Sequence, residues 1–93
     1  MRLDLFLKSS RLIPRRSLAQ EFCDAGMIEV NGSPAKSSKE IKAGDEIAIK
    51  RRNRLTKVAV VTIPEKKQVS KADAGDLYNV IADEINAEAD GLS

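Results

Sequence analysis

Ninety-three residues are enough for one modest hydrophobic core and leave no room for a second, catalytic domain beside it. The apolar fraction of 42% and the charged fraction of 32% are typical of a folded, soluble chain rather than a disordered one. The net charge of +2 conceals an asymmetry, because thirteen Lys and Arg accompany seven Asp and Glu through Lys57, whereas three accompany seven from Val58 onward. The basic part predicts a polyanionic partner, and the acidic part predicts a solvated helix, a protein contact or a guard against non-specific nucleic-acid binding.

The residue types that most catalytic and metal sites need are missing. The chain has no histidine and a single cysteine, Cys23, so it lacks the commonest general base and cannot assemble a zinc cluster. None of its glycines follows the spacing of a phosphate-binding loop. The longest nearly apolar run, Val58 to Ile63, is too short to span a bilayer. We therefore expect a cytoplasmic protein that is not an enzyme and has no membrane contact, cofactor, metal or catalytic residue.

Two short helices are predicted at the N-terminus. Asp4 would lie in the first turn of the first helix, where a negative charge suits the helix dipole. Pro14 is expected at the first position of the second helix and Gly26 just past its end. Apolar stripes at helical spacing support both helices: Leu3, Phe6 and Leu7 in the first, and Leu18, Ala19, Phe22 and Cys23 in the second.

Strands and tight turns should follow the helices. Met27 to Val30 is a short, largely apolar run, and Asn31-Gly32 behind it tolerates the positive φ angles of a two-residue hairpin turn. Gly44-Asp45 marks another turn, after which Glu46 and Ala48 alternate with Ile47 and Ile49 and indicate a strand. The sequence thus predicts an α+β fold with two N-terminal helices packed on a short mixed or antiparallel sheet.

The remaining chain predicts one more strand, a linker and a tail. The basic stretch 50–54 is expected in an exposed loop before a β-branched strand at 58–63, and Pro64 is expected to close the sheet. One domain would then comprise residues 1–64, with a linker at 65–72 and an acidic amphipathic C-terminal helix and tail at 73–93. The apolar stripe of that helix would be formed by Leu77, Val80, Ile81 and Ile85.

Arginine dominates the basic residues near the N-terminus. Its planar guanidinium donates two parallel hydrogen bonds to phosphate and stays charged at physiological pH. Arg15 and Arg16 are expected in the first turn of the second helix, where exposed positive charges oppose the dipole at about 0.3–1 kcal/mol each. Because no run of acidic residues lies nearby, this placement favours a bound anion over the alternative of a merely solvated face.

The aromatic residues narrow the type of polyanion. Phe6 and Phe22 lie on predicted core stripes, and Tyr78 is the only other aromatic residue, so no stacking platform for unpaired bases is expected. The target should be structured RNA, contacted mostly through phosphates and sugars. The basic cluster Arg51, Arg52 and Arg54 either extends this surface or only solubilises a sheet edge. The candidate RNA-binding residues are Arg2, Lys8, Arg11, Arg15, Arg16, Lys36, Arg51 and Arg52.

An ordered series of short motifs runs through the first half of the chain: Arg2-Leu3-Asp4, Phe6-Leu7, Ser10-Arg11-Leu12, Arg15-Arg16-Ser17, Ala19, Gly26 to Gly32, Lys36 and Gly44 to Ile47. In combination they resemble the RNA-binding domain of small-subunit ribosomal protein four, the S-four domain. The opening Met-Arg-Leu-Asp, the Arg-Leu-Ile-x-Arg-Arg stretch and the short acidic C-terminal segment are similar to the stand-alone RqcP-type family. Its larger relative, the ribosome-associated heat-shock S-four protein, has a longer and basic extension instead.

The resemblance implies a function on the ribosome. RqcP-type proteins bind obstructed large (50S) subunits that hold peptidyl-tRNA, contact ribosomal RNA and the tRNA, and assist C-terminal tailing of the stalled chain. By that resemblance the partners are large-subunit ribosomal RNA, peptidyl-tRNA and other ribosome quality-control factors, with a monomer off the ribosome and Arg2 and Arg16 as the first candidates for function. Two alternatives remain, a general heat-shock-type RNA chaperone and a protein-interaction adaptor whose C-terminal apolar stripe docks a partner. For that stripe, packing on the protein's own sheet is favoured over docking a partner.

Overall fold

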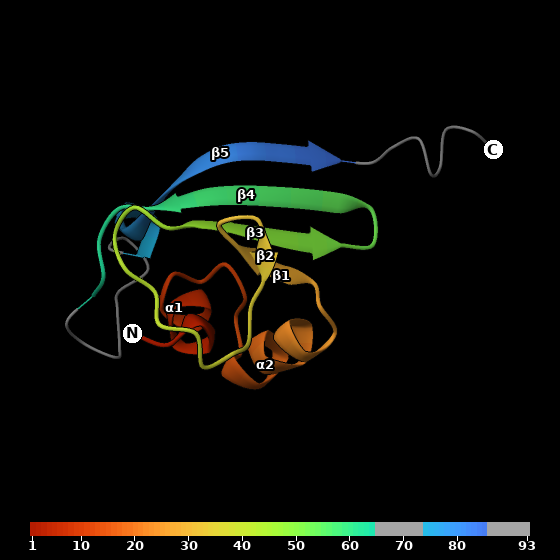
Figure 1. The fold of residues 1–93 in the computed structure, drawn as a ribbon. Helices are drawn as coiled ribbons and strands as arrows, with labels where there is room; N and C mark the ends of the chain where they lie inside the picture. Colours follow the sequence, from red (N-terminus) through yellow and green to blue (C-terminus); the bar gives the residue numbers. More distant parts are fainter. Residues whose placement is uncertain (65–73, 86–93) are drawn as a thin grey trace.

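Two short helices open the chain in the computed structural model, which describes residues 1–64 and 74–85 (Figure 1). Helix α1 spans Leu3–Ser9 and α2 spans Arg16–Asp24. The predicted stripe of α1 is confirmed, because its three apolar side chains are fully buried. Pro14, however, precedes α2 instead of opening it. The buried Ile13 anchors the link by donating its N–H to the carbonyl of Leu7 (3.1 Å). The chain bends through residues 12–14, and α2 begins only after the extended Arg15.

Glycine and asparagine residues make the two turns that the sequence predicts here. Gly26 follows α2 with a φ of +75°, a conformation that favours glycine and ends the helix. Asn31 (φ +52°) and Gly32 (φ +88°) join strand β1 (Ile28–Val30) to β2 (Ser33–Pro34). Positive φ at both turn residues is the requirement of the tight hairpin predicted from this dipeptide, which the structure confirms.

All strand pairs of the single sheet are antiparallel, in the order β2-β1-β3-β4-β5. The longer strands are β3 (Glu46–Arg51), β4 (Arg54–Val60) and β5 (Tyr78–Ile85). Period-2 alternation places alternate side chains on one face, where they pack against the helices and form the core. These core residues of the sheet are Ile28, Val30, Ile47, Ile49, Val58 and Val60.

The basic stretch 50–54 is not the loop that the sequence predicted. Arg51 ends β3 and Arg54 begins β4, and the two are cross-strand partners. Only Arg52 and Asn53 form the turn. A two-residue connection suffices because antiparallel neighbours meet directly at a hairpin. The strand predicted at 58–63 correspondingly begins four residues earlier and ends at Val60.

The predicted C-terminal helix is wrong for residues 78–85. A short 3₁₀ turn (Gly75–Leu77) leads into β5, which pairs with β4 and extends the sheet beyond Pro64. β-branched Val80, Ile81 and Ile85 suit a strand, and β4 supplies a ladder of backbone hydrogen bonds, whereas a short isolated helix is only marginally stable in water. The predicted linker at 65–72 and the tail at 86–93 lie outside the described residues. No helix within the described ranges is long and apolar enough to cross a membrane.

Candidate nucleic-acid interface

One buried carboxylate gathers arginines from both helices. Asp4 on α1 is charged yet 0% exposed. Arg2 Nε lies 3.3 Å from Asp4 Oδ1, and Arg16 Nε lies 3.3 Å from Asp4 Oδ2. Arg2 immediately precedes α1 and Arg16 is the first residue of α2. Two predicted RNA-binding residues fourteen positions apart are thus fixed to a single side chain, at the N-termini of both helices.

Further donors keep this carboxylate ionised. Gln20 Nε2 on α2 donates a 2.8 Å hydrogen bond to Asp4 Oδ2, and the Leu5 N–H donates one of 2.8 Å to Oδ1. Burial raises the pKa of Asp4, but the hydrogen bonds from Gln20, Arg16 and Leu5 and the charge of Arg16 outweigh burial and leave the pKa below its ordinary value. The side chains of Arg2 and Arg16 remain 46% and 45% exposed, so their guanidinium groups can still meet an anion.

The structure corrects one step of the sequence argument. Arg16 was expected to lack an acidic partner, and it has one in Asp4. The absence of an acidic run near Arg15 and Arg16 did not reveal this, because Asp4 is twelve positions away and reaches Arg16 through the packing of α1 on α2. The pattern that could have revealed it is a lone Asp between the buried Leu3 and Phe6, since a buried charge requires a partner.

The sequence predicted Arg15 within the first turn of α2, and the structure places it just before that turn. It is the extended N-cap residue of α2, it is exposed, and it forms no ion pair with the other described residues. No side chain caps this helix and no acidic residue lies in its first turn. The N-terminal N–H groups of α2 therefore lie beside Arg15 and Arg16 without a capping carboxylate, an arrangement that favours phosphate oxygen.

The loop after β2 adds lysines beside α1. The Leu3 N–H donates to the Lys39 carbonyl (2.8 Å) and the Asp4 N–H donates to the Ser37 carbonyl (3.1 Å), which fixes residues 36–40 against the start of the helix. Lys36 and Lys39 are both exposed on this loop. Lys36 was predicted, whereas Lys39 was missed because nothing in the sequence indicates that the loop folds back onto α1.

Lys8 and Arg11 lie at the other end of α1. Lys8 is half-buried in its last turn, and Arg11 is exposed in the link that leads to α2, with a φ of +62°. These two residues lie neither at the start of a helix nor on the loop 36–40. We call the basic residues at those places the arginine–lysine cluster: Arg2, Arg15, Arg16, Lys36 and Lys39.

The second basic group is largely engaged within the protein. Arg51 Nη2 donates to the Leu12 carbonyl (3.1 Å) and ties the β3–β4 hairpin to the link between the helices. Arg54 donates two hydrogen bonds to Asp83 on β5, of 2.8 and 2.6 Å. These bonds raise the pKa of Arg54 and lower the pKa of Asp83. Arg52 at the turn is exposed and has no ion-pair partner in the described part of the chain.

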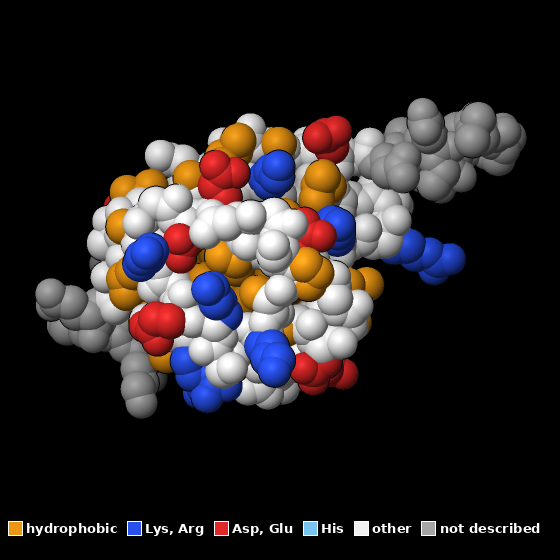
Figure 2. Space-filling model, viewed as in Figure 1, with side chains coloured by type: hydrophobic (Ala, Val, Ile, Leu, Met, Phe, Trp, Pro, Cys, Tyr) orange, Lys and Arg blue, Asp and Glu red, His pale blue; other side chains and the backbone are white. Residues whose placement is uncertain are grey.

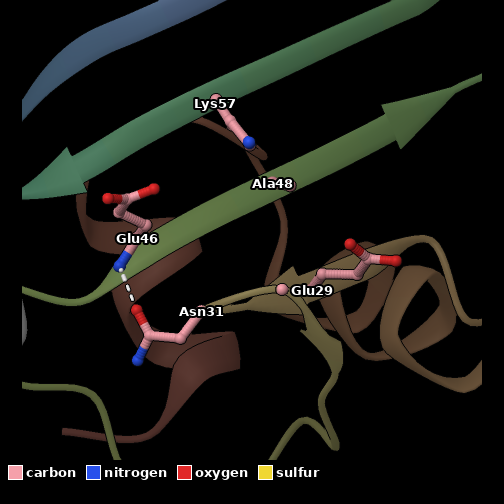
Figure 3. A pocket seen from close by; sticks show the side chains of 6 residues that line it. Glu29, Asn31, Glu46, Ala48 and Lys57 are labelled. Atoms are coloured by element: carbon pink, nitrogen blue, oxygen red, sulfur yellow. Dashed lines mark hydrogen bonds between the residues drawn. The ribbon is translucent and has the colours of Figure 1, made fainter.

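The sheet face opposite the helices has a different character. It contains a hollow of about 380 Å³ lined by Glu29, Asn31, Glu46, Ala48 and Lys57, together with Gly32 (Figure 3). The Asn31 amide oxygen accepts the Glu46 N–H there (2.9 Å). Glu29 is paired with Lys50 (2.7 Å), and the charges of Glu46 and Lys57 offset each other, so the hollow has no net positive charge to attract phosphate. In Figure 2, blue Lys and Arg side chains lie over the helical half, with red ones among them, and also at the hairpin end, and the edge along β5 exposes orange and red side chains beside a blue one.

Comparison with known proteins shows the family to which this chain belongs. The model of the S4 domain, the S-four domain expected from the sequence, matches residues 1–47. A curated relative from Halalkalibacterium halodurans, named RQC P-site tRNA stabilizing factor, is 46% identical over 84 residues, which cover 90% of this chain and 93% of that protein. The chain belongs to the S4 domain family, in the group of the RQC P-site tRNA stabilizing factors. A Bacillus subtilis protein of the same name is 43% identical, covering 90% of this chain and 95% of that protein.

Solved S4 domain structures have the same architecture. Heat Shock Protein 15 of Vibrio cholerae, described as trimeric, aligns with a TM-score of 0.78 at 28% identity and covers 88% of this chain and 82% of that chain. The solution structure of the hypothetical protein HP1423 aligns with a TM-score of 0.77 at 38% identity and covers 88% and 98%. The α+β fold and the family expected from the sequence are therefore confirmed. RNA binding and ribosome quality control are properties of this S4 family group.

Proposed function

We propose that this protein binds obstructed large ribosomal subunits in the cytoplasm, contacts ribosomal RNA and peptidyl-tRNA, and thereby assists C-terminal tailing of the stalled nascent chain. The observation that carries the proposal is the pair of arginines held on Asp4 at two helix N-termini. The name of the curated relatives, RQC P-site tRNA stabilizing factor, supports the tRNA part.

The chemistry of the arginine–lysine cluster suits the backbone of folded RNA. Guanidinium groups, lysines and uncapped helix N–H groups all recognise phosphate oxygens, which carry no base identity. Phe6 is fully buried, and Phe22 and Tyr78 pack against the core, so the aromatic side chains are not available as a stacking platform. Recognition would then follow the shape of RNA, and affinity would fall steeply with salt.

Co-sedimentation with purified large subunits that retain P-site tRNA tests the proposal. We expect wild-type protein to move with these subunits and to remain bound in the presence of excess bulk tRNA. A general RNA chaperone would instead be competed away. If the protein stays at the top of the gradient when such subunits are abundant, the ribosomal function is wrong.

Two variants that each remove one positive charge test which surface contacts RNA. Arg16→Ala should weaken binding by about tenfold or more and lower the salt slope by about one, because one phosphate contact is lost. Lys57→Ala is the matched control, since it removes one positive charge from the opposite face of the sheet. Equal losses in both variants would show that only net charge matters and would refute the assignment of the arginine–lysine cluster.

A further inference from the structure

β5 is an edge strand of eight residues with one unpaired side. β4 pairs with it from Val60↔Tyr78 to Arg54↔Ile85, and no strand within the described ranges covers its other side. The other edge strand, β2, has only two residues. An exposed edge presents backbone N–H and C=O groups that can pair with a further extended chain. Of the two edges, β5 alone is long enough to offer a template.

Apolar side chains are concentrated on this edge strand. Val80 is 56% exposed, Ile81 50% and Ile85 67%, and these are three of the four large exposed apolar side chains among the described residues. A bulge leaves Ile81 without a partner on β4, whereas Val80 lies opposite the fully buried Val58. The apolar surface of β5 therefore continues the core of the sheet outward.

The usual protection of an edge is incomplete here. In natural proteins, Lys, Pro, inward-pointing charges and bulges prevent an edge strand from pairing with a strand of another chain. The segment 74–85 contains neither Lys nor Pro nor Arg. Apart from its single bulge, β5 is open to strand addition.

The charge of the segment selects the class of partner. Of its three carboxylates, Asp83 is bound by Arg54, whereas Asp76 and Glu84 are exposed and have no ion pair with other described residues. They lie near opposite ends of β5, so a phosphate backbone would be repelled along the whole edge. A second copy of the chain would bring two acidic edges together. A basic polypeptide would neutralise both carboxylates.

We propose that β5 is a docking edge for an extended, lysine- or arginine-bearing segment of a partner protein, which adds to the sheet as a sixth strand. Its basic side chains would meet Asp76 and Glu84, and its apolar side chains would cover Val80 and Ile85. Figure 1 shows β5 at the edge of the sheet that lies away from α1 and α2. RNA on the helices and a protein strand on β5 can therefore be bound at the same time.

A pair of synthetic peptides tests this on the full chain. The first alternates valine and threonine between terminal lysines, and the second has glutamates in place of the lysines. Amide NMR should show that the lysine peptide protects backbone N–H groups of residues 78–85 and binds about fivefold or more tightly than the glutamate peptide. Replacing Asp76 and Glu84 together by Lys should reverse this preference without touching the Arg54–Asp83 pair.

Two further measurements separate the alternatives. Arg16→Ala should leave peptide binding unchanged, because Arg16 lies on α2 and not on β5. A failure of RNA binding and a failure of this proposal are therefore distinguishable. Light scattering over a range of protein concentrations should show the same mass for the wild type and for Val80→Lys, because no dimer forms through β5. A β5-mediated dimer, protection elsewhere in the chain, or equal binding of both peptides would overturn the proposal.

Discussion

Replacing Asp4 by Asn tests whether RNA binding depends on the fixed positions of Arg2 and Arg16 or only on the net charge of the protein. The substitution keeps the size of the side chain but removes the negative charge and turns one acceptor oxygen into a donor. Four N–H groups lie around the carboxylate: Gln20 Nε2, the Leu5 N–H and the Nε of Arg2 and Arg16. At least one of them would then face the new amide NH2 group, to which it cannot donate. Electrostatics alone predicts tighter RNA binding, because the protein gains one unit of positive charge. Loss of the fixed guanidinium positions predicts weaker binding.

The cost to stability can be estimated from the same contacts. A lost hydrogen bond to a buried charged acceptor costs about 1.5–3 kcal/mol, and each half-exposed arginine pair adds about 0.2–1 kcal/mol. With two such pairs, the free energy of unfolding should fall by about 2–5 kcal/mol in total, a large fraction of the stability of a domain of this size. Urea unfolding followed by circular dichroism at pH 7 measures it, with Asp24→Asn as control, since Asp24 is exposed at the end of α2.

The pH dependence follows from the lowered pKa of Asp4. A carboxylate whose folded-state pKa is depressed stabilises the protein above its unfolded-state pKa, and this contribution is lost as the pH falls through the folded-state value. The difference in free energy of unfolding between wild type and Asp4→Asn should have its full size at neutral pH. It should become smaller as the pH falls below 3.8, the ordinary pKa of an Asp carboxyl. If Asp4→Asn is as stable as Asp24→Asn at pH 7 and binds RNA more tightly than wild type, the reasoning about Asp4 is refuted.

Three other changes test separate parts of the structure. Gly32→Ala should destabilise the fold by about 1–2 kcal/mol because of its φ of +88°, whereas Gly75→Ala, with no positive φ, should not; equal effects in urea unfolding would contradict the turn geometry. Burial, with the charges of nearby Asp side chains, raises the pKa of the Cys23 thiol from 9.0 to about 11, so alkylation at pH 8 should be about a hundredfold slower in the native than in the urea-unfolded protein. Arg51→Ala should lower the free energy of unfolding by about 1–2 kcal/mol and Arg52→Ala by at most about 0.5 kcal/mol, because only Arg51 bonds to a backbone carbonyl; the reverse order would show that the hairpin is not held by Arg51.

The sequence predicted the parts of the fold that depend on local pattern. Helical spacing located Leu3, Phe6 and Leu7 on a buried face, and Asn31-Gly32 identified a turn, because these signals arise from backbone geometry within a few residues. The segment 78–85 was misassigned for the opposite reason. Its apolar residues fit a helical stripe, but β4 supplies a ladder of hydrogen bonds, and a sequence pattern cannot report such a distant partner.

The candidate site divides in the same way. Arginine-rich composition, the missing histidines and the family motifs predict an RNA-binding surface near Arg2, Arg15 and Arg16, which stays a prediction. Tertiary packing decided how these residues are arranged, because Asp4 meets Arg16 only when α1 packs on α2, and Lys39 joins Arg2 only when its loop folds back. By itself the sequence determined which charges the protein carries and the helices and turns near them. Only the tertiary structure decided which charges neutralise one another and which remain exposed, since these pairings depend on distances between residues far apart in the chain.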